Sequence, residues 1–198
     1  HLDPRGTPRP SLVSVTWTAV AVALSYLLPR PPPLVARWRF PLLLLLFLAQ
    51  TAVVFRYHRL PLVDVWLFRQ AGTQALAHGA NPYEIVLPNI YRHDRFYGPA
   101  ALQDRKVVVY PYPPLMALLD LPALLFLGDV RWTCVAAAIA AAALISRLGD
   151  RTTGELAGLL VLFQPRTIWV AEVSWTEPVL LAAAAAALLT LRRWSWRA

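Results

Sequence analysis

Asp64 is the residue whose type and position best suit acid–base chemistry in this sequence. It begins a stretch with helical periodicity that runs to His78, and at about 100° per residue it shares a face with Phe68, Ala71 and Ala75. A carboxylate on an apolar face must gain a partner or a proton, because burying it unpaired is expensive. Two interpretations follow: Asp64 is a general base, or it caps the helix by accepting hydrogen bonds from the amides that follow it.

Asp120 is a second acidic candidate, because it lies inside an apolar run from Leu115 to Leu127. Ionisable residues in such runs usually face a cavity or a partner. If the run lies at a membrane surface instead, the carboxylate reaches water and needs neither. Both interpretations stay open, and we predict Asp120 as a substrate-binding residue.

Glu172, Glu177 and Arg166 form a third group of candidates near the end of the chain. Glu177 precedes a helix expected to start near Pro178, where an acidic residue suits the positive end of the helix dipole. Arg166 either pairs with Glu172, which is the favoured interpretation, or binds a phosphate. We predict all three as substrate-binding residues, with the first-turn role as the alternative for Glu177.

Aromatic side chains concentrate in the central stretch and form either an interfacial belt or a platform for a sugar or an isoprenoid. They are Trp66, Tyr83, Tyr91, Tyr97, Tyr110 and Tyr112, of which we predict Tyr110 and Tyr112 as substrate-binding. His78 and His93, with Asp64 or Asp94, match no metal-ligand spacing. The sequence therefore predicts no metal site, and we expect no other cofactor.

Composition indicates a membrane protein, since 58% of the 198 residues are hydrophobic and the mean hydropathy is +0.48. The net charge of +8 is spread between apolar runs, which favours roles in topology and lipid contact over nucleic-acid binding. The single cysteine, Cys134, excludes a disulfide framework within the chain. The chain starts at His1 and stops abruptly at Ala198, which predicts a piece of a longer protein.

Six apolar runs separate the polar segments, and from them we expect five or six membrane helices. Several runs are shorter than the roughly 20 residues that a span needs, so flanking residues must extend them or some do not span. The runs cover residues 11–28, 40–55, 115–127, 132–145, 156–170 and 175–191. The first run also resembles a signal peptide, but no small-residue cleavage site follows it, so we expect a retained helix. The prolines at 29–33 end it, and we expect Arg30, Arg37 and Arg39 in a short connection before the second helix.

Short arginine-rich connections tend to stay cytoplasmic, which places the central stretch on the outer side of the membrane. Its helix would lie along the membrane surface, with a polar face opposite Phe68. That face carries Arg69, Gln70, Thr73 and Gln74. The predicted fold is all-α: a polytopic membrane helical bundle with an extracytoplasmic first loop that contains a surface helix. We expect one domain: a flexible tail (1–10), two helices (11–55), the loop (56–114) and three to four further helices (115–193).

Three motifs, taken in order, resemble the GT-C superfamily of glycosyltransferases, and within it the bacterial polyprenol-phosphate-mannose-dependent mannosyltransferases. They are the first-loop acid Asp64, the turn Gly79-Ala80-Asn81-Pro82-Tyr83, and Tyr110-Pro111-Tyr112-Pro113-Pro114-Leu115 before a membrane helix. The resemblance covers residues 60–193. It implies a multi-pass enzyme of the bacterial inner membrane that moves a sugar, mannose in this group, from a polyprenyl-phosphate donor to a glycolipid, polysaccharide or protein acceptor. Such enzymes have more helices than this chain.

By this resemblance Asp64 is the catalytic base, residues 110–115 close the loop, and Trp175-Thr176-Glu177-Pro178 is the later acidic segment. The leaving lipid phosphate needs cations nearby. The candidates are Arg92, Arg95, Arg105, Lys106 and Arg166. Two other classes stay open: a truncated, non-catalytic membrane protein that binds polyprenyl lipid or a partner, and a small transporter, for which no internal repeat is found.

Overall fold

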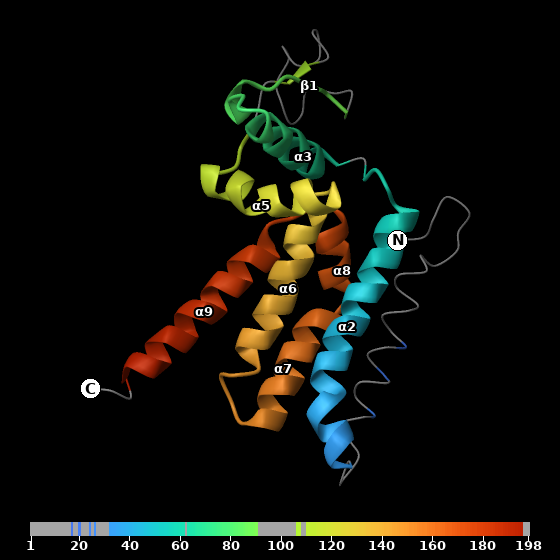
Figure 1. Cartoon of the computed structure of the whole chain (residues 1–198), viewed down its shortest axis with the longest axis vertical. Coiled ribbons are helices and arrows are strands. Elements are labelled where there is room, and N and C mark those ends of the chain that lie inside the picture. Colours follow the sequence, from blue (N-terminus) through green and yellow to red (C-terminus); the bar gives the residue numbers. More distant parts are fainter. Residues whose placement is uncertain are drawn as a thin grey trace. The chain divides into compact units, whose positions relative to one another are not determined.

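The computed structural model describes residues 17, 20, 24, 26, 32–61, 63–90, 106, 107 and 110–195 of the chain. These residues are mostly helical (Figure 1), which confirms the all-α class. The tail at 1–10, most of the first apolar run, and three predicted phosphate ligands, Arg92, Arg95 and Arg105, lie outside the described residues.

The described chain contains seven α-helices, one 3₁₀-helix (η1) and two short strands. In order they are α2 (Pro33–Tyr57), α3 (Asp64–Ala77), η1 (Pro82–Glu84), β1 (Leu87–Pro88), β2 (Lys106–Val107), α5 (Pro114–Leu127), α6 (Arg131–Ile145), α7 (Arg151–Phe163), α8 (Pro165–Glu172) and α9 (Glu177–Ser195). The strands pair antiparallel, Leu87 with Val107 and Pro88 with Lys106.

Helix α2 begins well before the apolar run that predicted it. Pro33 stands in its first turn, where the missing N–H would be unpaired in any case. Arg37 and Arg39 therefore lie inside the helix, and their placement in a connection was wrong. The prolines that we expected only to stop a helix also start one, because a fixed φ suits the first helical residue.

The predicted helix at 156–170 is two helices, α7 and α8, that meet at Gln164. Gln164 has extended backbone angles, as the residue before a proline prefers, and Pro165 begins the next helix. Helix α7 also starts earlier than its apolar run, because the Asp150 side chain accepts hydrogen bonds from the amides of Thr152 and Thr153. A hydrogen bond with the Thr153 side chain is the largest cause that lowers the pKa of Asp150, and the two amide hydrogen bonds lower it further.

The described contacts divide the chain into two compact units where the sequence predicts one domain. Unit 1 comprises residues 1–59, 134–172 and 176–198, and unit 2 comprises residues 60–133 together with 173–175. Unit 2 thus corresponds closely to the polar, aromatic central stretch of the sequence, extended by α5 and by three residues that connect α8 to α9.

Unit 1 packs helices at close range through small residues. A Cβ atom added to Gly158 of α7 would lie 2.5 Å from the carbonyl oxygen of Ala142 in α6, so only glycine allows this approach. Against α7, helix α2 contributes Phe47, whose ring meets that of Phe163 edge-on at 5.9 Å between centroids. Helix α7 thus runs beside both α2 and α6, as Figure 1 shows.

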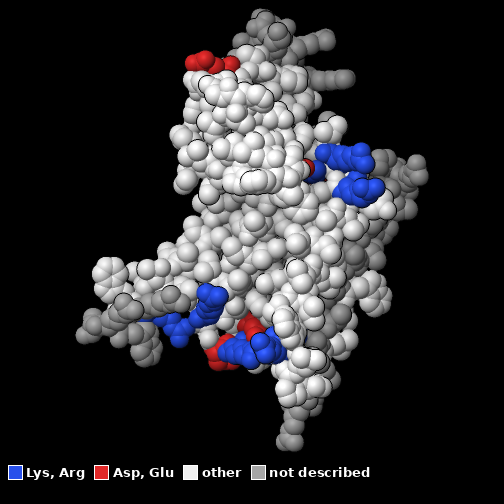
Figure 2. Space-filling view, viewed as in Figure 1, with Lys and Arg blue, Asp and Glu red and all other residues white. Residues whose placement is uncertain are grey.

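A charged cluster surrounds Glu155 near the start of α7. The carboxylate accepts hydrogen bonds from Arg39 Nε at 3.2 Å, Arg151 Nε at 3.0 Å and the Tyr26 hydroxyl at 2.8 Å. Acidic and basic side chains gather at this end of α7 in Figure 2. Glu155 is buried in an apolar protein because these three donors compensate its charge.

One described helix, Ala36–Tyr57, is long and apolar enough to cross a membrane. Up to three spans result if each of two bent pairs, α5 with α6 and α8 with α9, counts as one span; the second pair bends by 118°. Large apolar side chains stay exposed along these helices, among them Leu42 and Leu45 of α2 and Leu188 of α9. These observations favour membrane association.

Candidate functional site in unit 2

Arg69 of α3 and Asp120 of α5 form an ion pair in which neither side chain has any exposed surface. The guanidinium donates from Nε to Oδ2 at 2.9 Å and from Nη2 to Oδ1 at 2.5 Å, in a bidentate arrangement. Nη1 donates to the carbonyl oxygen of Ser174 at 2.5 Å. Helix α3 lies against α5 in Figure 1, and the pair fixes one helix on the other.

This pair corrects the predicted surface helix. Arg69 and Thr73 lie on the polar face of the predicted surface helix, yet both are fully buried, and Phe68 on the opposite face is buried as well. Only Gln74 of the four polar residues on that face is exposed. The prediction was wrong because α5, which packs against α3, supplies the Asp120 carboxylate as a partner for Arg69. The helical period of α3 alone does not show that this partner exists. Asp120 has a partner, as one of its two interpretations required.

Gln70 and Trp66 extend this contact from α3 to the turn that follows α5. Gln70 donates through Nε2 to the Gly128 carbonyl oxygen at 3.0 Å and accepts at Oε1 from the Val130 amide at 3.1 Å. The indole nitrogen of Trp66 donates to Asp129 Oδ1 at 3.3 Å. Helix α3 is therefore positioned along its length by polar contacts as well as by apolar packing.

Asp64 is the first residue of α3 and is partly exposed. Val63 occupies the N-cap position with an extended backbone, so Asp64 itself is not the N-cap. Asp64 Oδ1 accepts a hydrogen bond from the amide of Val65 at 2.8 Å. Asp64 therefore accepts a hydrogen bond from an amide of the first turn, as the capping interpretation expected, but from the position after the N-cap. It also keeps the partial exposure that a general base needs.

Three tyrosines bring two of the sequence motifs together. Tyr83 of the Asn-Pro-Tyr turn donates its hydroxyl to the Tyr112 carbonyl oxygen at 2.9 Å. Its ring meets that of Tyr110 edge-on at 5.4 Å, and the Tyr110 and Tyr112 rings lie 5.7 Å apart. Tyr110 also lies directly over Gly72 of α3, where an added Cβ would fall 2.3 Å from its ring.

The three tyrosines Tyr83, Tyr110 and Tyr112 differ in how much of the side chain is exposed to solvent. Tyr110 is 5% exposed, so it is a core residue and not part of an interfacial belt, whereas Tyr83 is 44% exposed. Tyr112 lies between them. Tyr91 and Tyr97, the other two tyrosines of the predicted belt, lie outside the described residues.

The charges of Arg69 and Asp64 both act on the Tyr112 phenol. Burial raises the pKa of the Tyr112 phenol to about 12; the positive charge of Arg69 opposes this effect and the negative charge of Asp64 adds to it. Burial likewise raises the pKa of Tyr110 to about 12, with the negative charge of Asp120 as the next contribution. Both phenols are therefore protonated at neutral pH and can donate hydrogen bonds.

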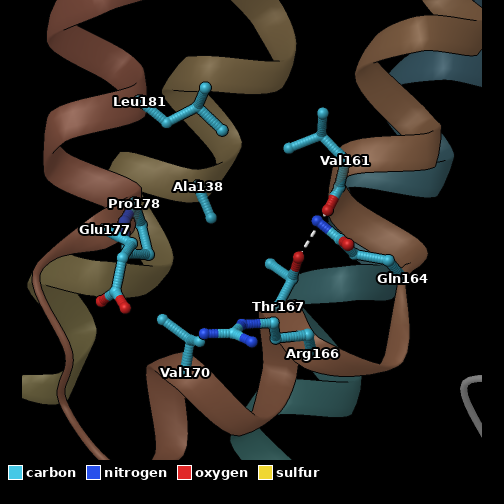
Figure 3. Close-up of a pocket in the computed structure, with 9 residues that line it drawn as sticks. All are labelled: Ala138, Val161, Gln164, Arg166, Thr167, Val170, Glu177, Pro178 and Leu181. Atoms are coloured by element: carbon cyan, nitrogen blue, oxygen red, sulfur yellow. Dashed lines mark hydrogen bonds between the residues drawn. The ribbon is translucent and has the colours of Figure 1, made fainter.

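Three further predicted residues, Arg166, Glu172 and Glu177, lie in unit 1. Glu172 is buried, and its Oε1 lies 3.2 Å from Nδ1 of His58, a partner that the sequence did not suggest. Arg166 and Glu177 line a pocket between α6, α7, α8 and α9 (Figure 3). Glu177 stands in the first turn of α9, which confirms that expectation. Only the backbone of Lys106 is described, in β2.

Unit 2 thus unites Asp64, Tyr110, Tyr112 and Asp120, whereas Arg166, Glu172 and Glu177 belong to unit 1. Sequence reasoning missed Arg69, whose guanidinium contacts Asp120 and influences both tyrosines. A signal was present, because a carboxylate inside an apolar run requires a cation and Arg69 is the arginine inside the neighbouring amphipathic helix.

Comparisons with protein-family models, curated proteins and solved structures found no match to this chain. The resemblance to GT-C glycosyltransferases therefore stays a prediction that depends on the motifs alone.

Proposed function

We propose that the protein is a multi-pass membrane glycosyltransferase of the bacterial inner membrane that uses Asp64 as its general base. The sugar, mannose by the family resemblance, comes from a polyprenyl-phosphate donor. It passes to a hydroxyl group of an extracytoplasmic glycolipid, polysaccharide or protein.

One observation carries the proposal: the three motifs behind the resemblance, far apart in sequence, belong to one compact unit. Tyr83 is bonded to Tyr112, and the charge of Asp64 acts on the Tyr112 phenol. A carboxylate whose charge acts on a half-buried tyrosine is suited to contact with a sugar, since the aromatic ring packs against C–H groups of the sugar while the phenol donates to its oxygens.

In the proposed reaction the acceptor oxygen attacks the anomeric carbon of the donor. A new carbon–oxygen bond forms there while the bond from that carbon to the phosphate oxygen breaks, and polyprenyl phosphate leaves. Asp64 removes the proton from the acceptor hydroxyl as the oxygen attacks. Cations of the loop stabilise the charge on the leaving phosphate; the candidates are Arg92, Arg95, Arg105 and Lys106.

The test is sugar transfer from radiolabelled polyprenyl-phosphate mannose into lipid and polymer fractions, with membranes that contain the inserted chain. We expect Asp64→Asn to lower the transfer rate by about 100-fold or more, the usual contribution of a general base. The asparagine keeps an oxygen that can accept from the Val65 amide, so the start of α3 is preserved.

Glu84→Gln is the matched control, because Glu84 is an exposed carboxylate of the same unit and glutamine still accepts from Asn81. We expect this control to transfer sugar at the wild-type rate. Equal rates for Asp64→Asn and wild type would remove Asp64 from the mechanism. No transfer by the wild-type chain, once its insertion is demonstrated, would favour a lipid-binding or scaffolding protein.

A further inference from the structure

The pocket of unit 1 combines an apolar wall with two opposite charges. Its volume is about 260 Å³. The wall comes from α6, α7, α8 and α9, and its apolar residues are Ala138, Val161, Val170, Pro178 and Leu181. Pockets for small ligands in proteins usually hold about 300–1,000 Å³, so this one suits a headgroup and the first carbons of a chain, not a whole lipid.

The two charged residues line the pocket from different helices. In Figure 3 the Arg166 side chain extends from α8 and the Glu177 side chain from α9. Both are exposed, so a ligand can reach them. Within the part of the chain that the structure describes, no side chain forms an ion pair with Glu177, and its carboxylate can still receive a cation.

Thr167 and Gln164 are the other polar residues that line the pocket, and only Gln164 has an amide that can either donate or accept a hydrogen bond there. The Thr167 hydroxyl donates to the Val161 carbonyl oxygen at 2.5 Å, so its proton serves the joint between α7 and α8. Gln164 sits at that same joint, and Figure 3 shows its amide at the edge of the pocket, where it can donate or accept. The break before Pro165 is therefore what brings Gln164 and Arg166 to one site.

We propose that this pocket binds the headgroup of a zwitterionic phospholipid of the phosphatidylethanolamine type. Arg166 would pair with the phosphate and Glu177 with the ammonium, while the carbons next to the phosphate lie on the apolar wall. A headgroup with a phosphate alone gains from Arg166 but is repelled by Glu177, so the pair of charges selects a headgroup that carries both.

The surroundings of the pocket favour a lipid over a soluble zwitterion. Helix α9, which contributes Pro178 and Leu181 to the wall, continues with Leu180, Leu188 and Leu191 exposed to its surroundings. An exposed apolar row beside a pocket is the surface along which acyl chains lie. The headgroup would thus bind next to the leucines of α9 that contact the acyl chains of the same lipid. This proposal does not depend on glycosyl transfer.

The experiment measures binding of short-chain phosphatidylethanolamine and phosphatidylglycerol to the purified full chain in detergent, by native mass spectrometry. We expect phosphatidylethanolamine to bind about tenfold more tightly, the effect of one charge-assisted contact. Glu177→Gln should remove this preference, mainly by lowering the affinity for phosphatidylethanolamine. Arg166→Gln should lower the affinity for both lipids by about tenfold.

Arg56→Gln is the matched control, since Arg56 is an exposed arginine of α2 that does not line the pocket. Its lipid affinities should equal those of wild type, and all affinities are compared at a temperature at which each variant is folded. Equal affinity of the wild type for both lipids, or unchanged affinities in Glu177→Gln and Arg166→Gln, would overturn the proposal. So would free phosphoethanolamine binding as tightly as the lipid, which would identify a site for a soluble zwitterion.

Discussion

All three side-chain nitrogens of Arg69 donate hydrogen bonds to oxygen atoms of the protein, and the side chain has no exposed surface. These hydrogen bonds explain how an arginine can lie in the core of unit 2. Two donors bond the Asp120 carboxylate, and the third bonds the carbonyl oxygen of Ser174, a non-glycine residue with φ of 65°. A left-handed backbone at such a residue costs roughly 1–2 kcal/mol. The hydrogen bond from Arg69 offsets part of that cost and fixes the turn between α8 and α9.

Removal of one partner of this pair should be far more damaging than removal of both. Arg69→Met leaves a buried carboxylate and Asp120→Leu leaves a buried guanidinium, so each should lower the free energy of unfolding by about 3–5 kcal/mol. The double variant leaves no charge unpaired and should lose less than either single variant. Fluorescence-monitored unfolding in detergent measures all three. A double variant as unstable as the sum of the singles would contradict this account.

The tyrosine pair predicts a loss of stability at alkaline pH. Tyr110 and Tyr112 have pKa values of about 12 in the folded protein, above the ordinary value of 10.0. Between those values the folded state holds more protons than the unfolded state, so stability falls as pH rises. We expect the unfolding temperature to drop as pH increases from 10 to 12, and to drop less in Tyr112→Phe. An identical decline in Tyr112→Phe would show that this phenol does not titrate as described.

The identity of some site residues follows from sequence, but their partners do not. Asp120 stands out because an acid interrupts an apolar run, and Asp64 because it starts a helix next to aromatic residues. Arg69 does not, because a helical period gives the relative direction of side chains on α3 but not which direction faces the protein. The partner becomes visible only when α5 is placed against α3.

Helix α3 depends on a single glycine for its close contact with the loop before α5. Tyr110 covers Gly72 so closely that a methyl group there would overlap the aromatic ring. The same ring then meets Tyr83, so the position of α3 determines the position of the Asn-Pro-Tyr turn. One missing side chain thus supports the arrangement of the whole tyrosine group.

Gly72→Ala should therefore destabilise unit 2 even though alanine favours helices. Overpacking of a tight contact costs about 1–3 kcal/mol, which exceeds the gain of up to about 1 kcal/mol in helix propensity. Gly149→Ala is the matched control, because its nearest neighbour would be an ordinary contact at 3.6 Å. Thermal unfolding should separate the two variants. A Gly72→Ala protein as stable as wild type would show that Tyr110 can move away without loss.

Helix ends were the least predictable part of the fold, and prolines explain the largest errors. The same residue type that ends one helix begins the next, at Pro33 for α2 and at Pro165 for α8. Apolar periodicity located α5 and α6 within one or two residues. It could not locate the joint at Gln164, because apolar residues continue on both sides of the break.

At the scale of the whole molecule, the sequence separated a polar, aromatic insert from apolar helices, and the contacts divide the chain in nearly the same way. What the sequence could not give is the membership of α5. By composition it is a membrane helix, yet it belongs to unit 2 through its buried contact with α3. A hydropathy profile cannot distinguish an apolar helix that spans a bilayer from one that packs beside it.

The proposed topology predicts which surfaces meet the cell exterior. In a Cys134→Ala background, a cysteine at Ala80 lies on an exposed turn of unit 2 and one at Arg37 lies near the exposed start of α2. We expect a membrane-impermeant maleimide to label Ala80→Cys in intact cells and Arg37→Cys only after permeabilisation, because arginines close to the end of a membrane helix favour the cytoplasmic side. The reverse pattern would invert the topology and exclude an extracytoplasmic site.

The residues Val173–Trp175 belong to unit 2, although the helices on both sides of them belong to unit 1. This has a consequence for biosynthesis, in which a chain emerges from the ribosome starting at its N-terminus. Arg69 and Asp120 are both translated before Ser174, so their ion pair can form first. The hydrogen bond from Arg69 Nη1 to the Ser174 carbonyl oxygen can form only after the end of α8 has been made. Unit 2 is therefore completed late in translation, by a segment that reaches it only after most of unit 1 exists.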